Sequence, residues 1–329
     1  MIGKGCLFKQ TLGHFCVDAS CAAVVIGTTQ DMASAIKFFI LYNFLAFCLQ
    51  PLAGLFLDKI KKLQPKAYII YSFILLLLGF IPHFNIWLRI ISVGMGNCLF
   101  HVGAGTVILT SSQNKMAPLG IFVSSGAVGL LLGTLFAHYP GCHLVLLLSL
   151  LALILLNLDV PEKVKMNVSN FVHINVTLLL CLCIAIRSFM GFMPLTNFEK
   201  TPLVLCMITF GVFMGKSLGG ILCDRWGIRK VVYISTAFVM ALFLFSFQNP
   251  YLWTLVQIIV NLSMPITLYL MYKSMPRYPA FSFGLAASFL VVGLLISNML
   301  SSFNIPPACF LVLFLVNSII ILSAERKIK

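Results

Sequence analysis

The segment GGILCDRWGIRK occupies residues 219–230, where a long apolar run gives way to a short basic loop. A shorter version, GLFLDK, occupies residues 54–59 at the end of another apolar run. The aspartates of the two segments, Asp58 and Asp224, are separated by about half the length of the 329-residue chain. This recurrence indicates a chain built from two related halves.

A second pair of motifs repeats at almost the same offset. Gly120 and Gly129 lie in one apolar run, and Gly284 and Gly293 lie in another with the same spacing. Glycine is common in membrane helices, so one pair alone could arise by chance. Two pairs at equivalent places indicate an internal duplication, which is typical of secondary transporters.

The composition predicts an integral membrane protein. The chain is 60% hydrophobic and 9% charged, with a mean hydropathy of +1.05. A soluble domain of this size cannot bury so much apolar surface, so the bilayer must act as the solvent. We expect twelve spans, near residues 7–28, 34–57, 66–83, 86–111, 116–138, 142–158, 171–194, 202–223, 230–248, 250–271, 279–301 and 305–323.

The distribution of charge predicts the topology. The net charge of +14 comes from single basic residues and small clusters between apolar runs, which argues against a nucleic-acid partner. With a cytoplasmic N-terminus, almost all of them fall in inner loops, as the positive-inside rule requires. We therefore expect an even number of spans, both termini in the cytoplasm, and the plasma (inner) membrane as the location. The longest inner loop, 159–170, predicts a linker between bundles 1–158 and 171–329.

The segment 219–230 resembles the G-x-x-x-D-R-x-G-R-R signature of the major facilitator superfamily. The copy at 54–62 keeps the glycine, the aspartate and the basic residues but lacks the second glycine. The segments 13–18 and 97–101 resemble the branch of fosmidomycin-resistance-like exporters. The resemblance implies an all-α membrane protein with twelve transmembrane helices in two pseudo-symmetric six-helix bundles. Thr134 stands where the family's antiporter pattern has a proline, so the sequence does not indicate antiport.

The repeated motif predicts a gate at the ends of two spans. Its glycines permit close helix approach, and its aspartates can pair with basic side chains or cap a neighbouring helix. Such contacts would hold the halves in one state and break in another, as alternating access requires. The alternative is a basic loop that only sets the topology. The predicted gating residues are Gly54, Asp58, Lys59, Gly220, Asp224, Arg225, Gly227 and Arg229.

Ionisable side chains inside the apolar runs predict the transport site, because a buried charge is costly unless it is paired or hydrated. Asp18 is the only acidic residue near the centre of any predicted span, and His14 lies one turn before it. In the resembled fold, spans 1, 4, 7 and 10 line the cavity, which would bring Asp18 close to Arg187. The predicted cavity residues are Asp18, His14, Asn97, His101, Arg187, Lys216, Arg89 and Asn261, the last of which precedes a kink expected at Pro265.

We predict that Asp18 carries the coupling proton, under the influence of a neighbouring histidine or cation. The alternative is a static Asp18–Arg187 pair that only holds the halves together. We expect His101 to line the cavity or form hydrogen bonds rather than bind a metal, and we expect neither a metal nor a cofactor.

The basic residues of the predicted site outnumber Asp18, which favours an anionic or zwitterionic small-molecule substrate. We expect a monomeric, proton-coupled secondary transporter in the lipid bilayer. A drug or metabolite exporter of the same fold, a lipid flippase, and a non-transporting sensor or scaffold are the alternatives. The sequence has no H-E-x-x-H or G-x-S-x-G motif and no paired intramembrane aspartates, so we do not expect an enzyme. Substrate identity, transport direction and coupling mode stay open.

Overall fold

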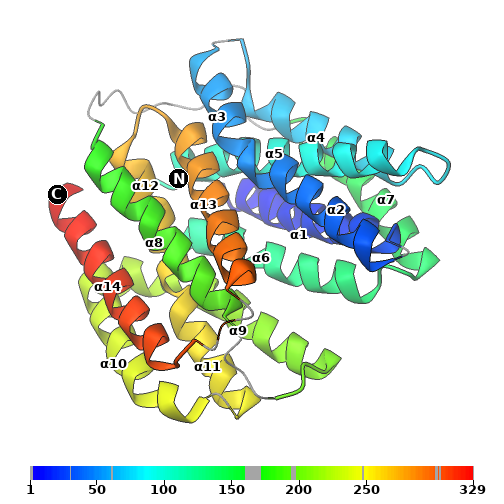
Figure 1. Cartoon of the computed structure of the whole chain (residues 1–329). Coiled ribbons are helices and arrows are strands. Elements are labelled where there is room, and N and C mark those ends of the chain that lie inside the picture. The colour runs from blue at the N-terminus through cyan, green and yellow to red at the C-terminus, as the bar shows by residue number, and fades with distance from the viewer. Residues whose placement is uncertain are drawn as a thin grey trace. The chain divides into compact units, whose positions relative to one another are not determined.

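The computed structural model describes residues 3–29, 31–60, 62–159, 172–193, 198–246, 248–300, 303 and 305–328, and these residues are helical almost throughout (Figure 1). The elements are α1 (Lys4–Gly27), α2 (Met32–Asn43), the π-helical segment η1 (Phe44–Cys48), α3 (Gln50–Lys59), α4 (Pro65–Gly79), α5 (Ile86–Ser111), α6 (Ala117–Leu135), α7 (Pro140–Leu156), α8 (Ile174–Phe192), α9 (Pro202–Trp226), α10 (Ile228–Ser246), α11 (Pro250–Asn261), α12 (Ser263–Ser274), α13 (Pro279–Met299) and α14 (Ala308–Ile328).

Two of these helical stretches consist of shorter pieces. Elements α2, η1 and α3 form one apolar stretch, Ala33–Lys59, and α11 and α12 form another, Pro250–Ser274. With each stretch counted once, the described residues form twelve helical segments, the number that the sequence predicts. Among the described residues, nine helices are long and apolar enough to cross a membrane, and α4 and α7 are shorter apolar helices.

Prolines account for both interruptions. Pro265 has no N–H group for the carbonyl of Asn261, and α11 ends at Asn261. Pro51 likewise provides no donor to the carbonyl four residues before it, and the π-helical turn η1 lies directly upstream. The side chain of Gln50 adds a hydrogen bond beside this interruption, since its Nε2 donates to the carbonyl of Ala46 at 2.7 Å.

The chain forms two compact units. Unit 1 comprises Met1–Gln113, Ser125–Asn167 and Tyr278–Gly284, and unit 2 comprises Asn114–Ser124, Val168–Arg277 and Leu285–Lys329. Each unit therefore includes a short segment from the other half of the sequence: the start of α13 in unit 1 and the start of α6 in unit 2. The predicted linker 159–170, apart from Asp159, lies outside the described residues, and the predicted domain boundary stays a prediction.

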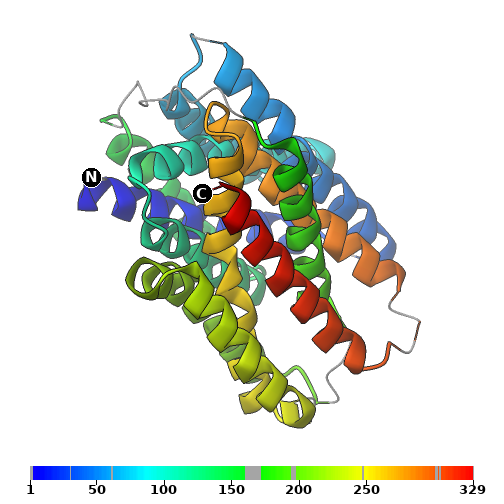
Figure 2. The same ribbon diagram turned by 90° about the vertical axis from the view of Figure 1, so that its left-hand side faces the viewer.

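Each unit has its own core. In unit 1, α5 packs against α4 and α1, and the fully buried rings of Phe73 and Phe100 meet at a centroid distance of 5.6 Å. In unit 2, α8 and α14 lie side by side, as Figures 1 and 2 both show. Trp253 and Phe310 pack there at 6.0 Å within a buried cluster contributed by α8, α10, α11 and α14.

The outer face of α7 shows why the bilayer must be the solvent. Leu144, Leu148, Leu151 and Leu155 recur at helical spacing, and all four are exposed. A continuous leucine stripe on the surface is costly in water and favourable against lipid. The pattern supports the prediction of an integral membrane protein.

The motif glycines lie at close helix contacts. A β-carbon at Gly54 would overlap the backbone carbonyl of Ala280, and one at Gly220 would overlap the carbonyl of Met116. Each contact lies within one unit: the Gly54 contact is in unit 1, and the Gly220 contact is in unit 2. Glycine is needed at these two positions because it lets the two backbones touch.

We expect Gly220→Ala to lower the midpoint of thermal unfolding of the detergent-solubilised protein. The added methyl group must displace a backbone carbonyl, and such overpacking costs roughly 1–3 kcal/mol. Gly191→Ala is the matched control, because a β-carbon there meets nothing within 4 Å. The control should leave the midpoint unchanged or slightly higher; equal midpoints for the two variants would contradict the close contact.

Candidate functional site

Asp58 and Asp224 each bind the first turn of a helix from the other half of the sequence. Asp58, near the end of α3, accepts hydrogen bonds from the N–H groups of Ala280 and Phe281 at 3.1 and 2.8 Å, at the start of α13. Asp224, near the end of α9, accepts from the N–H groups of Met116 and Ala117 at 2.8 and 3.0 Å, at the start of α6.

These carboxylates satisfy backbone donors that the start of a helix leaves without intrahelical partners, and their negative charge is favourable at that end. Of the two contacts that the sequence analysis considered for the motif aspartates, helix capping is the one seen here. The two caps are equivalent under the internal repeat, since each half of the sequence supplies one aspartate and one capped helix.

The second glycine of the motif has a separate structural role. Gly227 follows α9 with φ +82°, and its N–H donates to the carbonyl of Cys223. Glycine adopts this left-handed conformation without strain, which is why it commonly ends helices. In the first copy, the corresponding position is Lys61, which lies outside the described residues; Ile60 directly before it is extended.

The basic residues of the second motif lie at the helix surface. Arg229 donates from Nε to Oε2 of the buried Glu325 at 2.9 Å, which connects the start of α10 to the end of α14. Arg225 of this motif and Lys59 of the first copy are exposed. Glu325 was not predicted from the sequence, where its only signal is an acidic residue near the end of an apolar run.

In unit 1, four predicted site residues of α1 and α5 form one cluster. His14 Nε2 lies 3.3 Å from Oδ2 of Asp18 and 2.9 Å from Nε2 of His101. His101 Nε2 lies 3.8 Å from Oδ1 of Asp18, and Asn97 donates from Nδ2 to the same oxygen at 3.2 Å. His14 and His101 are buried, and the Asp18 side chain is 18% exposed.

Two residues that the sequence analysis missed complete this cluster. Tyr42 on α2 has its hydroxyl 3.1 Å from Nδ2 of Asn97. A β-carbon at Gly126 on α6 would overlap Asp18 and His14, so this glycine leaves room for both side chains. A tyrosine inside an apolar run could have indicated the first, but a single glycine among many could not have indicated the second.

In unit 2, Arg187 on α8 is buried with only neutral partners. Its Nη1 donates to Thr267 Oγ1 at 2.8 Å, and its Nη2 lies 2.8 Å from the sulfur of Met264, both on α12. Within the described part of unit 2, no carboxylate lies within 4.0 Å of this guanidinium. The predicted pairing of Arg187 with Asp18 stays a prediction.

The remaining predicted cavity residues make other contacts. Arg89 donates from Nε to the carbonyl of Gly79 at 2.8 Å, at the end of α4, where a cation is favourable. Asn261 donates from Nδ2 to the carbonyl of Gln257 at 2.9 Å and ends α11. Lys216 is half-buried on α9. These contacts give Arg89 and Asn261 roles at helix ends.

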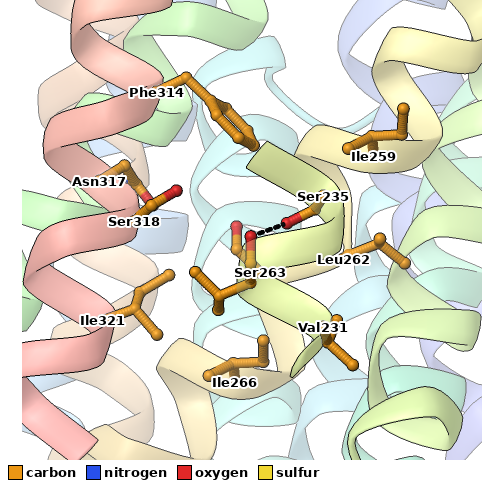
Figure 3. Close-up of a pocket in the computed structure, with 11 residues that line it drawn as sticks. Val231, Ser235, Ile259, Leu262, Ser263, Ile266, Phe314, Asn317, Ser318 and Ile321 are labelled. Carbon is orange, nitrogen blue, oxygen red and sulfur yellow. Dashed lines mark hydrogen bonds between the residues drawn. The ribbon is translucent and has the colours of Figure 1, made fainter. Parts of the chain in front are cut away.

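Figure 3 shows a small cavity in unit 2 between α10, α11, α12 and α14. Ser235, Ser263, Asn317 and Ser318 provide its polar lining, and Ser235 donates from Oγ to the carbonyl of Val232 at 2.9 Å. Its volume of about 10 Å³ holds roughly one water molecule. The cavity is therefore too small to bind a transported solute.

No protein-family model matches the sequence, and no curated protein matches it. Solved structures do match. A variant of the E. coli fucose:proton symporter FucP aligns over 98% of both chains with a TM-score of 0.74 and 14% identity. The chain has the major facilitator fold. A bacterial homologue of the iron transporter ferroportin, in an outward-facing state, covers 98% of both chains with a TM-score of 0.63 and 13% identity.

These likenesses confirm the predicted fold class of twelve transmembrane helices in two pseudo-symmetric six-helix bundles. A further FucP structure, described as a major facilitator transporter in the outward conformation, agrees with a TM-score of 0.72 and 15% identity over 98% of this chain and 99% of the other. Identities this low concern the fold alone.

Loss of the Asp224 carboxylate should expose the amides that it caps. Removing a helix cap costs about 1–2 kcal/mol, which corresponds to roughly 5–30-fold faster local opening. We therefore expect Asp224→Ala to accelerate amide hydrogen exchange at Met116 and Ala117 by that factor, measured by mass spectrometry on the solubilised protein.

Asp31→Ala is the control for this exchange experiment. Asp31 caps its own helix, α2, and a hydrogen bond from the N–H of Ser34 lowers the pKa of its carboxyl group. Loss of the Asp31 carboxylate should accelerate amide exchange at Ser34 and leave amide exchange at Met116 unchanged. Unchanged exchange at Met116 and Ala117 in Asp224→Ala would show that the cap does not form.

Proposed function

We propose that the protein is a secondary active transporter that moves a small polar solute, anionic or zwitterionic, by alternating access and with protons as the coupling ion. The observation that carries this proposal is the reciprocal pair of caps made by Asp58 and Asp224. In each, an aspartate from one half of the sequence binds the start of a helix from the other half.

Such caps suit a gate. Each consists of two hydrogen bonds to backbone N–H groups, a contact of about 1–2 kcal/mol in helix caps. Two contacts of this size are strong enough to bias an equilibrium between conformations and weak enough to break in every cycle. In this proposal they form in one transport state and break in the other.

Asp18 is the proposed proton carrier. It lies in the middle of the α1 sequence, contacts two histidines and an asparagine, and retains some exposure. A carboxylate held inside a membrane protein is a functional candidate by default. One protein with the same fold is named a fucose:proton symporter, which supports the proton as the coupling ion.

Arg187 is the proposed anion-binding residue. A guanidinium has five N–H donors that match carboxylate oxygens, and its described partners in unit 2 are a hydroxyl and a thioether. A buried cation with only neutral partners is costly in the absence of an anion. A negatively charged group of the substrate would supply the missing charge.

The proposal places the protein in the plasma (inner) membrane as a multi-pass monomer with both termini in the cytoplasm. The support is the bias of basic residues toward one side and the apolar outer faces of the helices.

Asp18→Asn tests proton coupling. We expect it to abolish uptake driven by a pH gradient in proteoliposomes while counterflow of the same solute continues, because the neutral amide cannot carry the proton. Asp159→Asn is the control, since Asp159 is an exposed carboxylate bound to Lys9 and should leave uptake intact. Proton-driven uptake at the unmodified rate in Asp18→Asn would refute this role.

Arg187→Gln tests the charge of the substrate. Hydrogen bonds to a charged group contribute about 1.5–3 kcal/mol, so we expect the affinity for an anionic substrate to fall roughly 10–150-fold and that for a neutral analogue to stay the same. Arg89→Gln is the control, because Arg89 binds a helix carbonyl. An equal loss for both solutes, or a loss as large in the control, would contradict the assignment.

A further inference from the structure

We propose that His14, Asp18 and His101 form a binding site for a divalent ion of a first-row transition metal. Their ligand atoms all lie within 4.8 Å of one another. The two imidazole Nε2 atoms are 2.9 Å apart, and the shortest nitrogen–carboxylate distance is 3.3 Å. Two ligand atoms bound about 2.1 Å from one ion lie roughly 3.0 Å apart at a right angle and roughly 3.4 Å apart at a tetrahedral angle.

The hydrogen bonding of His101 leaves the lone pair of its Nε2 available to the proposed ion. Its Nδ1 lies 3.0 Å from the backbone carbonyl oxygen of Asn97, which can only accept a hydrogen bond. Nδ1 must therefore carry the proton, and in the neutral ring Nε2 presents its lone pair to His14 and Asp18. Metal-binding histidines typically donate their other ring N–H to a backbone carbonyl or carboxylate, which fixes the orientation of the ring.

The facing nitrogens also need a positive charge or a proton between them. Two imidazole nitrogens at 2.9 Å cannot both present lone pairs, so in the ion-free protein one proton lies on the line that joins them. A metal ion bound by both nitrogens and by Asp18 would take the place of that proton, which would move to Nδ1 of His14 or to solvent.

The surroundings hold the carboxylate in position. Asn97 donates to Oδ1 of Asp18, and Gly126 leaves a space that any side chain would fill. The three ligands come from two helices, α1 and α5, that pack against each other in unit 1. A site built on rigid elements needs little rearrangement to bind an ion.

The donor set indicates the class of ion. Two imidazoles and one carboxylate suit Mn²⁺, Fe²⁺, Co²⁺, Ni²⁺ or Zn²⁺, whereas Mg²⁺ and Ca²⁺ prefer oxygen ligands only. Three protein ligands leave coordination positions open for water or a solute, whereas closed structural sites use four protein ligands. The ion should therefore exchange readily and be removed by a chelator.

This inference goes beyond the proposed function and does not depend on it. The proton of the proposed transport cycle and the metal ion would be alternative occupants of Asp18. Metal binding is measured on the purified protein without transport, so a failure of one claim is distinguishable from a failure of the other.

The test is direct titration of the full-length protein in detergent, with any affinity tag removed. We expect one equivalent of Zn²⁺ to bind by calorimetry, Co²⁺ to give the visible absorption of a nitrogen-ligated site, and Mg²⁺ to give no signal. Replacing a residue that hydrogen-bonds to a metal ligand typically costs 10–100-fold in metal affinity. The ligand variants His101→Gln, His14→Gln and Asp18→Asn should therefore each lose about 100-fold or more.

His143→Gln is the matched control, because His143 is also in unit 1 but contacts the carbonyl of Ala137 and the ring of Phe80, away from the proposed ligands. It should bind Zn²⁺ like the unmodified protein. Gly126→Ala keeps all three ligands and fills the space beside them, so it should also weaken binding. Thermal unfolding verifies that each variant is folded.

Absence of saturable Zn²⁺ binding, a Co²⁺ spectrum like that of the hydrated ion, or an equal loss in the control would overturn the proposal. The Co²⁺ spectrum of the unmodified protein decides the nature of the ligands even if a variant does not fold.

Discussion

The start of every helix leaves backbone N–H groups without partners, and in this protein two of those starts depend on distant aspartates. Asp58 and Asp224 each supply a charged acceptor to two such groups. The adjacent glycines, Gly54 and Gly220, let the backbones approach closely enough for these bonds to form. The glycine and the aspartate of each motif therefore act together: the glycine permits the close approach of the two helices, and the carboxylate stabilises it.

The duplicated frame, which consists of the repeated helices with their aspartate caps and motif glycines, carries different polar side chains in its two halves. Between α1 and α5, unit 1 holds a carboxylate with two imidazoles and an amide. Between α8 and α12, unit 2 holds a guanidinium with a hydroxyl and a thioether. The caps and their glycines recur in both halves, while the polar clusters do not. Divergence at these clusters and retention of the frame are expected if the frame serves movement and the clusters serve recognition.

The sequence predicts the frame better than the site. Span number and repeat follow from hydropathy and from Asp58 and Asp224, because these signals are local and periodic. The grouping of His14 and Asp18 with Asn97 and His101 needed only the correct helix neighbours. Arg89 illustrates the limit: its charge predicted a cavity residue, and its Nε donates to a carbonyl at the end of α4, a contact that the residue type did not indicate. Whether a buried cation binds a ligand or a helix end depends on side-chain direction, which residue type alone does not determine.

The two polar clusters differ in how completely they satisfy their own charges. Asp18 receives a hydrogen bond from Asn97 and lies beside two imidazoles, so much of its desolvation cost is offset within its own unit. Arg187 has five donors, and its described partners in unit 2 use two of them and carry no charge. A protein selected only for stability would replace such a cation with an apolar residue at little cost. In the proposed function, a negatively charged group of the substrate balances this cation when it binds.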